Sequence, residues 1–394
     1  MLKYKYRIII SYKKNAVKEF YMDFLKKIPN IDLWSYLSRT EKTVVMYGMG
    51  NGADKILKVC EKYNIKISDF FASDGFVRGH SFHGKRVLSY SEVKEKYGAE
   101  NIIILLSFGS SLPSVLSLIK AVKEECELYA PDVPVCGENL FTLGFFNANQ
   151  EKILKARELL ADKLSKKIFD NVILYKLTGK TEYLFDAECE RSDSFKLINA
   201  QEIRSFADLG AYRGDTLEEM LGYAPKLEYA YAFEPDARTY KKLSAFCDSY
   251  GGAVKLYPQN IAAWSESTTL TFNSSSNRNS GAFAPDTNAK AVEIKADSLD
   301  NILNGLPVDH IKYDVEGAEM QALKGSEKTI SKYHPSLTVS IYHRSEDIFA
   351  LPLQVHELNE NYKLYIRRYP YVPAWDLELI CIENPSEQSC TLQI

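Results

Sequence analysis

The sequence predicts an α/β protein built from two Rossmann-like domains. Two stretches, 43–54 and 205–216, run from a short apolar strand through a glycine turn into a helix. Around each of them, apolar or β-branched runs alternate with segments of helical periodicity, which is the β-α-β order of a parallel sheet. The length of 394 residues also exceeds what one ordinary core requires, so two domains are expected.

The composition is typical of a globular protein and favours neither a nucleic-acid partner nor a membrane span. Apolar residues make up 45% of the chain and charged residues 26%, with a formal net charge of −3. The basic face that nucleic acid requires is therefore not expected. The longest apolar run, 102–106, is far shorter than the roughly 20 residues of a membrane helix.

Cysteine usage and the N-terminal residues predict a cytoplasmic protein. Seven cysteines without a Cys-x-x-Cys pair favour reduced thiols over a disulfide framework or a zinc site. The apolar run 8–10 follows three basic residues, but it is too short for a signal peptide. The sequence leaves the oligomeric state open, a homo-oligomer included.

The first half begins with a helical lead-in, 15–40, followed by a strand and a glycine turn. The turn, Gly48-x-Gly50-x-x-Ala53, nearly matches the dinucleotide fingerprint, in which backbone N–H groups face a pyrophosphate. The next strand ends at Asp74, where a ribose-binding carboxylate would lie. Alternatively, the glycines only allow helix and strand to pack closely. The candidate nucleotide-binding residues are Gly48, Gly50, Asn51 and Asp74.

Two further motifs follow the second strand of this half, Asp74-Gly75 and Gly84-Lys85-Arg86-Val87. With them, residues 48–88 resemble the N-terminal nucleotide-sugar-binding domain of bacterial sugar acetyltransferases. No hexapeptide repeat follows, so acetyltransferase activity is not implied.

A charged, helical pattern from 149 to about 180 is expected to form a connecting helix pair. We therefore predict three parts, a Rossmann-like domain with its lead-in over 1–145, a helical connector over 146–198 and a second Rossmann-like domain over 199–394.

The second glycine turn follows Asp208, the acid that ends the short apolar run at the start of the stretch 205–216. Between Gly210 and Gly214 the turn lacks the glycine that lets a backbone approach a pyrophosphate. It suits a cofactor without phosphates, such as S-adenosylmethionine. The residues of this candidate cofactor turn are Asp208, Gly210, Tyr212, Gly214, Asp215 and Thr216.

The next two strands of this half also end in polar residues. Glu234 falls 24 residues after Gly210, where a carboxylate can accept both ribose hydroxyls, and Pro235 leads the chain out of the strand. The third strand, 253–257, is followed by Asn260-Ile261-Ala262, a polar and then apolar edge suited to an adenine. Since parallel strands end at one edge, these residues are expected to lie together.

The later strands carry charged residues and flank a polar loop. Strands expected at 268–272 and 291–295 enclose a loop containing Asn277, which is either a solvated hairpin tip or a substrate lid. Lys312, Asp314 and Glu316 alternate along the next strand and so share one face. The fifth strand ends at His343-Arg344, and two strands too close for an intervening helix complete the sheet.

Six motifs of this half occur in the order found in the FkbM family of methyltransferases, which residues 200–385 resemble. They are Phe206-Ala207-Asp208-Leu209-Gly210, Phe233-Glu234-Pro235, Asn260-Ile261-Ala262, Ile311-Lys312-Tyr313-Asp314-Val315-Glu316-Gly317-Ala318-Glu319, Leu323-Lys324-Gly325 and Ser340-Ile341-Tyr342-His343. The resemblance implies a class I methyltransferase fold and methyl transfer from S-adenosylmethionine to a hydroxyl of a sugar or related product. Tyr313 stands where an apolar residue is expected, but in a strand it points away from Lys312 and Asp314.

Methyl transfer to an alcohol requires in-line alignment and removal of the hydroxyl proton. We expect Asp314 to position or deprotonate the acceptor and His343, with an ordinary pKa near 6.5, to be the second choice as base. Lys312 would orient Asp314 by an ion pair. The expected substrate-binding residues are Glu316, Asn277 and Arg344. A divalent metal bound by Asp314 and Glu316 is conceivable, but no metal is expected, because no ligand cluster supports one.

The sequence thus predicts a methyltransferase that acts on a saccharide or nucleotide-sugar in glycan biosynthesis. One alternative is a non-catalytic nucleotide-sugar-binding protein with a degenerate methyltransferase fold. Another is a nicotinamide-dependent oxidoreductase that uses the first glycine turn, although that half has no Tyr-x-x-x-Lys pair.

Overall fold

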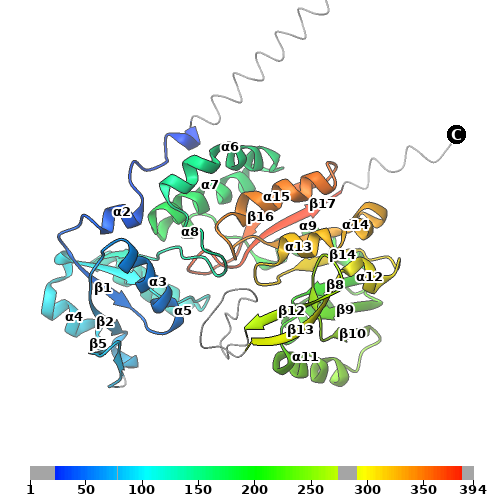
Figure 1. The fold of residues 1–394 in the computed structure, drawn as a ribbon, viewed down its shortest axis with the longest axis horizontal. Helices are drawn as coiled ribbons and strands as arrows, with labels where there is room; N and C mark the ends of the chain where they lie inside the picture. The colour runs from blue at the N-terminus through cyan, green and yellow to red at the C-terminus, as the bar shows by residue number, and fades with distance from the viewer. Residues whose placement is uncertain (1–22, 78, 274–290, 384–394) are drawn as a thin grey trace, which may run out of the picture.

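The computed structural model describes residues 23–77, 79–273 and 291–383. Asn277 and most of the loop predicted as a lid lie outside the described residues. The described chain contains two large parallel or mostly parallel sheets, both flanked by helices, which confirms the predicted α/β fold class (Figure 1).

The first sheet has five parallel strands in the order β5-β2-β1-β6-β7. Its strands are β1 (Thr43–Tyr47), β2 (Ile67–Ala72), β5 (Leu88–Ser89), β6 (Ile102–Leu106) and β7 (Glu127–Tyr129). β6 is buried along its whole length, as expected for the run Ile-Ile-Ile-Leu-Leu in an inner strand. The helices of this half are α2 (Leu33–Leu37), α3 (Asn51–Lys62), α4 (Tyr90–Tyr97) and α5 (Pro113–Glu125), and a short hairpin pairs β3 (Ser81–Phe82) with β4 (Lys85–Arg86).

Two long helices, α6 (Leu143–Leu159) and α7 (Lys163–Thr178), follow the first sheet, where the sequence predicts a helix pair. Thr142 and Asp162 cap their N-termini, and Gly179 ends α7 in a left-handed conformation, its N–H bonded to the Tyr175 carbonyl. Two short helices, α8 (Glu182–Phe185) and α9 (Arg191–Leu197), lead to the second sheet.

The second sheet has seven strands in the order β10-β9-β8-β14-β15-β17-β16. The first four neighbouring pairs are parallel, whereas β17 is antiparallel to both of its neighbours, as predicted. The strands are β8 (Ser205–Leu209), β9 (Tyr229–Phe233), β10 (Lys255–Gln259), β14 (His310–Tyr313), β15 (Ser336–Ser340), β16 (Lys363–Arg368) and β17 (Leu377–Ile382). β10 runs two residues beyond its predicted end and includes Pro258, which is tolerated because β10 is an edge strand.

Helices and a small sheet complete the second half. The helices are α10 (Asp215–Tyr223), α11 (Ala237–Ser249), α12 (Leu299–Leu303), α13 (Glu319–Lys324), α14 (Glu327–Tyr333) and α15 (Asp347–Leu358). In the small sheet, β13 (Ala291–Asp297) is the central strand. It pairs in parallel with β11 (Ala262–Ala263) and antiparallel with β12 (Thr268–Asn273). The two predicted strands on either side of the polar loop are thus present.

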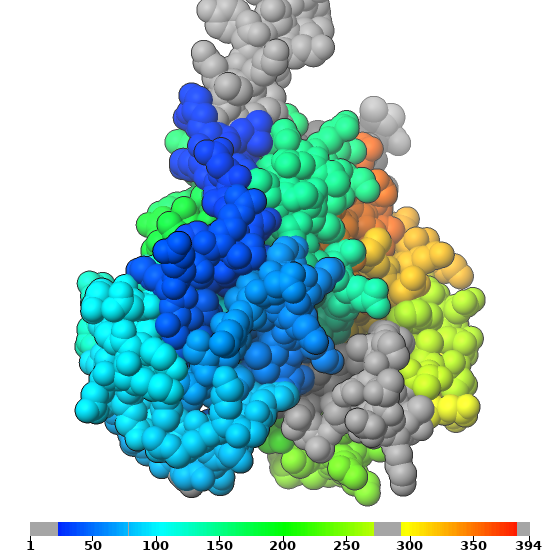
Figure 2. Space-filling view, turned by 60° about the vertical axis from the view of Figure 1, so that its left-hand side comes forward, coloured from blue at the N-terminus to red at the C-terminus, as the bar shows by residue number. Residues whose placement is uncertain are grey.

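One apolar core joins the two sheets through the connecting helices. It includes Val45 of β1, Ile104 of β6, Phe169 of α7, Ile311 of β14 and Ile366 of β16, all buried. The sheet regions therefore pack as one body, with α6 and α7 over both (Figures 1 and 2). This packing brings the loops of the first half next to the carboxyl edge of the second sheet.

Candidate functional site

The predicted site residues of the second half gather at one edge of the second sheet. β8, β9, β10, β14 and β15 are parallel, so their carboxyl ends meet there. In the register of β8 with β14, Lys312 pairs with Asp208, which sets the two side chains next to each other on one face. Tyr313 lies in the core on the opposite face, as its place in the strand predicts.

The turn after β8 needs a glycine because β14 passes directly beside it. Gly210 has a φ of +94°, and a Cβ at this position would lie 1.9 Å from the Asp314 carbonyl oxygen. The N–H groups of Gly210 and Ala211 both donate to the Phe233 carbonyl, and the Asp314 N–H donates to the Leu209 carbonyl. These bonds tie the turn to the ends of both neighbouring strands.

Asp208 and Lys312 form a buried ion pair at this edge. Lys312 Nζ lies 3.5 Å from Asp208 Oδ1 and 3.5 Å from Asp314 Oδ2. Burial raises the pKa of Asp208 to about 6, against the attraction of Lys312. Burial alone would lower the pKa of Lys312, but the two carboxylates outweigh it and the pKa is raised. Among the residues that the structure describes, none forms a hydrogen bond with the buried Asp208 Oδ2.

Glu234, at the end of β9, is a second buried carboxylate. Its exposed fraction is 7%, and burial raises its pKa to about 7, although N–H groups of Asp236 and Tyr212 donate to it. The side-chain amide of Asn260 donates to the carbonyls of Glu234 and Pro235, at 2.8 and 3.1 Å. Asn260 therefore holds the chain that leaves β9.

The carboxylate oxygens of these residues are hydrogen-bond acceptors and suit the polar groups of S-adenosylmethionine. The cofactor carries a cationic amino group, a sulfonium and two ribose hydroxyls, and the edge offers an unpartnered Asp208 oxygen and the Glu234 carboxylate. Thr216 instead lines a small interior cavity with Lys312 and Glu378. Asp215 is exposed at the start of α10.

His343 follows β15 and is enclosed by three carboxylates. Its Nδ1 lies 2.9 Å from Glu319 Oε1, while its Nε2 lies 3.5 Å from Asp314 Oδ1 and 3.7 Å from Glu316 Oε2. Burial alone would lower the pKa of His343, but these carboxylates raise it to about 10. The argument for His343 as a base from its ordinary pKa therefore does not hold in these surroundings. The pKa of Asp314 is lowered, because Lys312 and His343 outweigh its burial.

The loop between β14 and α13 brings Glu316 to the site in a strained conformation. Glu316 has a φ of +51°, which is uncommon for a residue other than glycine, and Gly317 follows with +92°. Arg344 Nε donates to the Gly317 carbonyl at 2.9 Å, so the guanidinium also supports this loop.

Three residues that the sequence argument did not assign also reach the site. Glu319 contacts His343, and the Tyr342 hydroxyl donates to Asp314 Oδ1 at 3.4 Å. Cys136, from the segment after β7, donates its N–H to the His343 carbonyl and its Sγ–H to the Glu316 carbonyl. Glu319 and Tyr342 stand within the quoted motifs, whereas nothing in the sequence connects Cys136 with residues 180 or more positions away.

The first glycine turn packs closely against β6. A Cβ at Gly52 would lie 2.1 Å from the Ser107 carbonyl oxygen, and one at Gly48 would lie 2.6 Å from Phe108. Asp74 accepts from the N–H and hydroxyl of Ser91, at the start of α4. Both observations favour the packing alternative, and nucleotide binding by this half stays a prediction.

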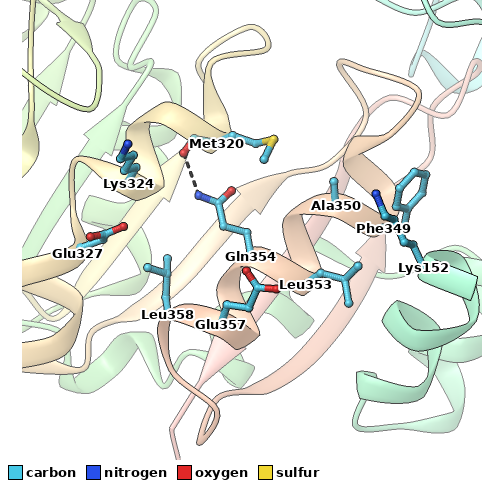
Figure 3. Close-up of a pocket in the computed structure, with 10 residues that line it drawn as sticks. All are labelled: Lys152, Met320, Lys324, Glu327, Phe349, Ala350, Leu353, Gln354, Glu357 and Leu358. Atoms are coloured by element: carbon cyan, nitrogen blue, oxygen red, sulfur yellow. Dashed lines mark hydrogen bonds between the residues drawn. The ribbon is translucent and has the colours of Figure 1, made fainter. Parts of the chain in front are cut away.

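One cavity lies away from these residues, on the outer surface formed by α6, α13, α14 and α15 (Figure 3). It has a volume of about 530 Å³, and Gln354 crosses it to donate to the Met320 carbonyl at 2.9 Å. None of the predicted site residues lines it. Among the described residues, no helix is long and apolar enough to span a membrane.

Comparison with known proteins identifies a family domain in the second half and a similar fold. Residues 208–372 match the family model of the methyltransferase FkbM domain. The crystal structure of methyltransferase FkbM from Methylobacillus flagellatus KT has a TM-score of 0.66 and 17% identity, covering 93% of this chain and 97% of that chain. No curated protein matches the chain.

Two further solved structures are less similar to the chain. An rRNA methylase from Streptococcus thermophilus has a TM-score of 0.32 and 14% identity, over 48% of this chain and 94% of that chain. Precorrin-6y C5,15-methyltransferase from Geobacter metallireducens GS-15 has a TM-score of 0.31 and 12% identity, over 49% and 87%.

The family match assigns a methyltransferase FkbM domain to residues 208–372, which confirms that part of the resemblance. The fold shared with the M. flagellatus structure extends over nearly the whole chain and confirms the predicted class I methyltransferase fold. The family model does not reach residues 48–88, so their resemblance to acetyltransferase domains stays a prediction.

Proposed function

We propose that this methyltransferase uses S-adenosylmethionine to methylate a hydroxyl of a saccharide or nucleotide-sugar in cytoplasmic glycan biosynthesis. The observation that carries the proposal is the set of buried carboxylates at neighbouring strand ends, Asp208 on β8 and Glu234 on β9, on either side of the Gly210 turn. Such buried acids contribute little to a core but suit a polar, cationic cofactor.

In this proposal, the cofactor residues each hold one part of S-adenosylmethionine. Asp208 and the turn from Gly210 to Gly214 bind the methionine end, with Tyr212, Asp215 and Thr216 around it. Glu234 accepts the ribose hydroxyls, and the segment from Asn260 to Ala262 borders the adenine. The cofactor supplies an electrophilic methyl group on its sulfonium.

The acceptor end of the site lies between β14 and β15. Asp314 lies against Lys312, His343 and Tyr342, and it is the carboxylate placed to orient the acceptor hydroxyl or accept its proton. Glu316 and Arg344 border the same space and are proposed to contact the acceptor. Asn277 lies outside the described residues, and its role in substrate binding stays a prediction.

The first half offers a second candidate role. A fluorescence titration with NADH tests the nicotinamide-dependent alternative for the turn from Gly48 to Asn51, and we expect no enhanced emission. Enhanced emission would instead favour the nicotinamide-dependent alternative.

Cofactor affinity should depend on pH through Glu234. Its pKa of about 7 means that the carboxylate, which accepts the ribose hydroxyls, is lost as the pH falls below 7. We expect the affinity for S-adenosylmethionine to fall about tenfold between pH 8 and pH 6, by the change in ionised fraction. Isothermal titration calorimetry at several pH values measures it.

Glu234→Gln is the matched variant for this titration. The amide of the variant cannot ionise. At pH 8 the variant should therefore bind S-adenosylmethionine more weakly than the wild type, and its affinity should lack the part of the pH dependence that Glu234 causes. If the two proteins show the same pH profile, Glu234 does not bind the ribose in its ionised form.

A further inference from the structure

The acceptor end of the site contains a group of metal-ligating side chains, of which the sequence alone suggested only Asp314 and Glu316 as conceivable ligands. Asp314, Glu319 and His343 each place one ligand atom within 4.8 Å of the others. Glu316 adds an oxygen 3.7 Å from His343 Nε2. The expectation that no metal binds rested on the lack of a ligand cluster, and the fold assembles one from β14, α13 and the end of β15.

The imidazole of His343 is held from behind by Glu319. Glu319 Oε1 lies 2.9 Å from Nδ1 and also accepts the N–H groups of Val315 and Gly317, at 3.0 and 3.3 Å. Glu319 is 1% exposed, so it has little freedom to move. A histidine that binds a metal through one nitrogen commonly has a carboxylate at the other nitrogen, which fixes the ring orientation.

The opposite nitrogen, Nε2, faces the two remaining carboxylates. It lies 3.5 Å from Asp314 Oδ1 and 3.7 Å from Glu316 Oε2. Metal–ligand bonds of about 2.1 Å in a tetrahedral site set the donor atoms about 3.4 Å apart, so this spacing is close to that of a metal site. The Glu316 side chain is 39% exposed and can adjust, whereas His343 is rigidly buried.

The cluster also has an excess of negative charge. Asp314, Glu316 and Glu319 surround one imidazole, and Lys312 is shared between Asp314 and Asp208 at 3.5 Å from each. His343 is fully buried, and among the described residues its Nε2 has no hydrogen-bond partner and faces only the Asp314 and Glu316 carboxylates at 3.5 and 3.7 Å. A buried imidazole nitrogen that faces two carboxylates without a hydrogen bond is costly unless a cation is bound between them.

We propose that His343 Nε2, Asp314 and Glu316 bind one divalent transition-metal cation such as Mn²⁺ or Zn²⁺, with Glu319 as the positioning residue of the histidine. One nitrogen and two carboxylate oxygens suit such borderline cations. Metal binding does not require the proposed methyl transfer. If that function holds, the cation lies where the acceptor hydroxyl would bind, and coordination would lower the pKa of that hydroxyl.

A metal titration of the full chain tests this proposal. The chelator-treated protein is titrated with Mn²⁺, and free Mn²⁺ is followed by electron paramagnetic resonance. We expect one Mn²⁺ per wild-type chain, no binding by His343→Gln, and a loss of about 10- to 100-fold in affinity for Glu319→Gln, as for other such supporting carboxylates. Gln keeps an oxygen for the N–H groups of Val315 and Gly317, so the loop should persist.

Glu327→Gln serves as the control, because Glu327 lines the outer cavity and not this cluster. It should bind Mn²⁺ like the wild type. The proposal is overturned if the wild type binds no Mn²⁺ at millimolar concentration, or if His343→Gln and Glu327→Gln bind it equally.

Nitrogen NMR of the wild type with Zn²⁺ makes the test independent of whether the variants fold. A metal-bound His343 should have an unprotonated Nε2 whose resonance shifts on addition of Zn²⁺. An imidazole that stays protonated on both nitrogens at saturating Zn²⁺ would contradict the proposal. S-adenosylmethionine binding by the same metal-free protein is measured separately. If the protein did not bind the cofactor, the proposed function would be overturned, but the proposed metal site would not.

Discussion

Asp208→Asn should reduce the affinity for S-adenosylmethionine about 100-fold, which corresponds to roughly 2.7 kcal/mol of binding free energy. Asp208 is fully buried at the end of β8, and its Oδ2 has no partner within the described residues. The substitution keeps the size of the side chain but removes the charge that would attract the cationic methionine end. Calorimetric titration of the variant and the wild type measures the difference.

Loss of binding must be separated from loss of folding in this variant. Removing one partner of a buried ion pair can cost roughly 3–5 kcal/mol, but Lys312 keeps Asp314 at 3.5 Å, so we expect a smaller cost. Glu218→Gln, on the exposed face of α10, is the control and should bind like the wild type. If the Asp208→Asn protein has the same thermal unfolding midpoint as the wild type and binds S-adenosylmethionine with the same affinity, Asp208 is not part of the cofactor site.

Gly210→Ala should destabilise the fold by about 3 kcal/mol or more, through left-handed strain and overpacking together. The added Cβ would lie 1.9 Å from the Asp314 carbonyl oxygen, and the φ of +94° disfavours any side chain. The obstacle is backbone of β14, which cannot rotate away as a side chain can. Thermal unfolding should show a clear decrease in the midpoint temperature.

Gly222→Ala is the matched control for this substitution. Gly222 lies in α10, and a Cβ there would have no neighbour within 4 Å. Because alanine favours a helix over glycine by roughly 0.5–1 kcal/mol, this variant should be as stable as the wild type or slightly more stable. Equal midpoints for the two alanine variants would show that the turn and β14 are not in the close contact described.

Much of the second sheet could be predicted from the sequence, because its strands end in distinctive residues. Asp208 and Glu234 each follow an apolar run, Asp314 ends a strand with alternating charges, and parallel strands bring such ends to one edge. The antiparallel position of β17 could also be predicted, since no helix fits between it and β16. The exact ends of the strands are harder to predict. β10, for example, continues through Pro258, beyond the end that the sequence predicts.

The surroundings of His343 could not be predicted from the sequence. Its pKa depends on Glu319 and Glu316, which reach it only through the turn between β14 and α13. The same holds for Cys136, which the packing of the first half brings against His343 and Glu316. Spacing in the sequence carries information on neighbours within a strand or turn, but not on contacts between loops far apart in the chain.

The first half shows that one glycine motif is compatible with two different roles, and its nucleotide binding stays a prediction. Gly48-x-Gly50-x-x-Ala53 and Asp74 have the spacing of a nucleotide site. In the structure the Asp74 carboxylate binds the start of α4, and Gly52 meets the Ser107 carbonyl. A glycine turn required for close packing has the same sequence pattern as one that binds phosphate.

Calorimetric titration of the wild-type protein with S-adenosylmethionine tests the proposed function most directly. Buried carboxylates at Asp208 and Glu234 on either side of the Gly210 turn predict saturable binding of one cofactor per chain, stronger at pH 8 than at pH 6. No binding at millimolar S-adenosylmethionine by a folded protein would contradict a methyltransferase that uses this cofactor.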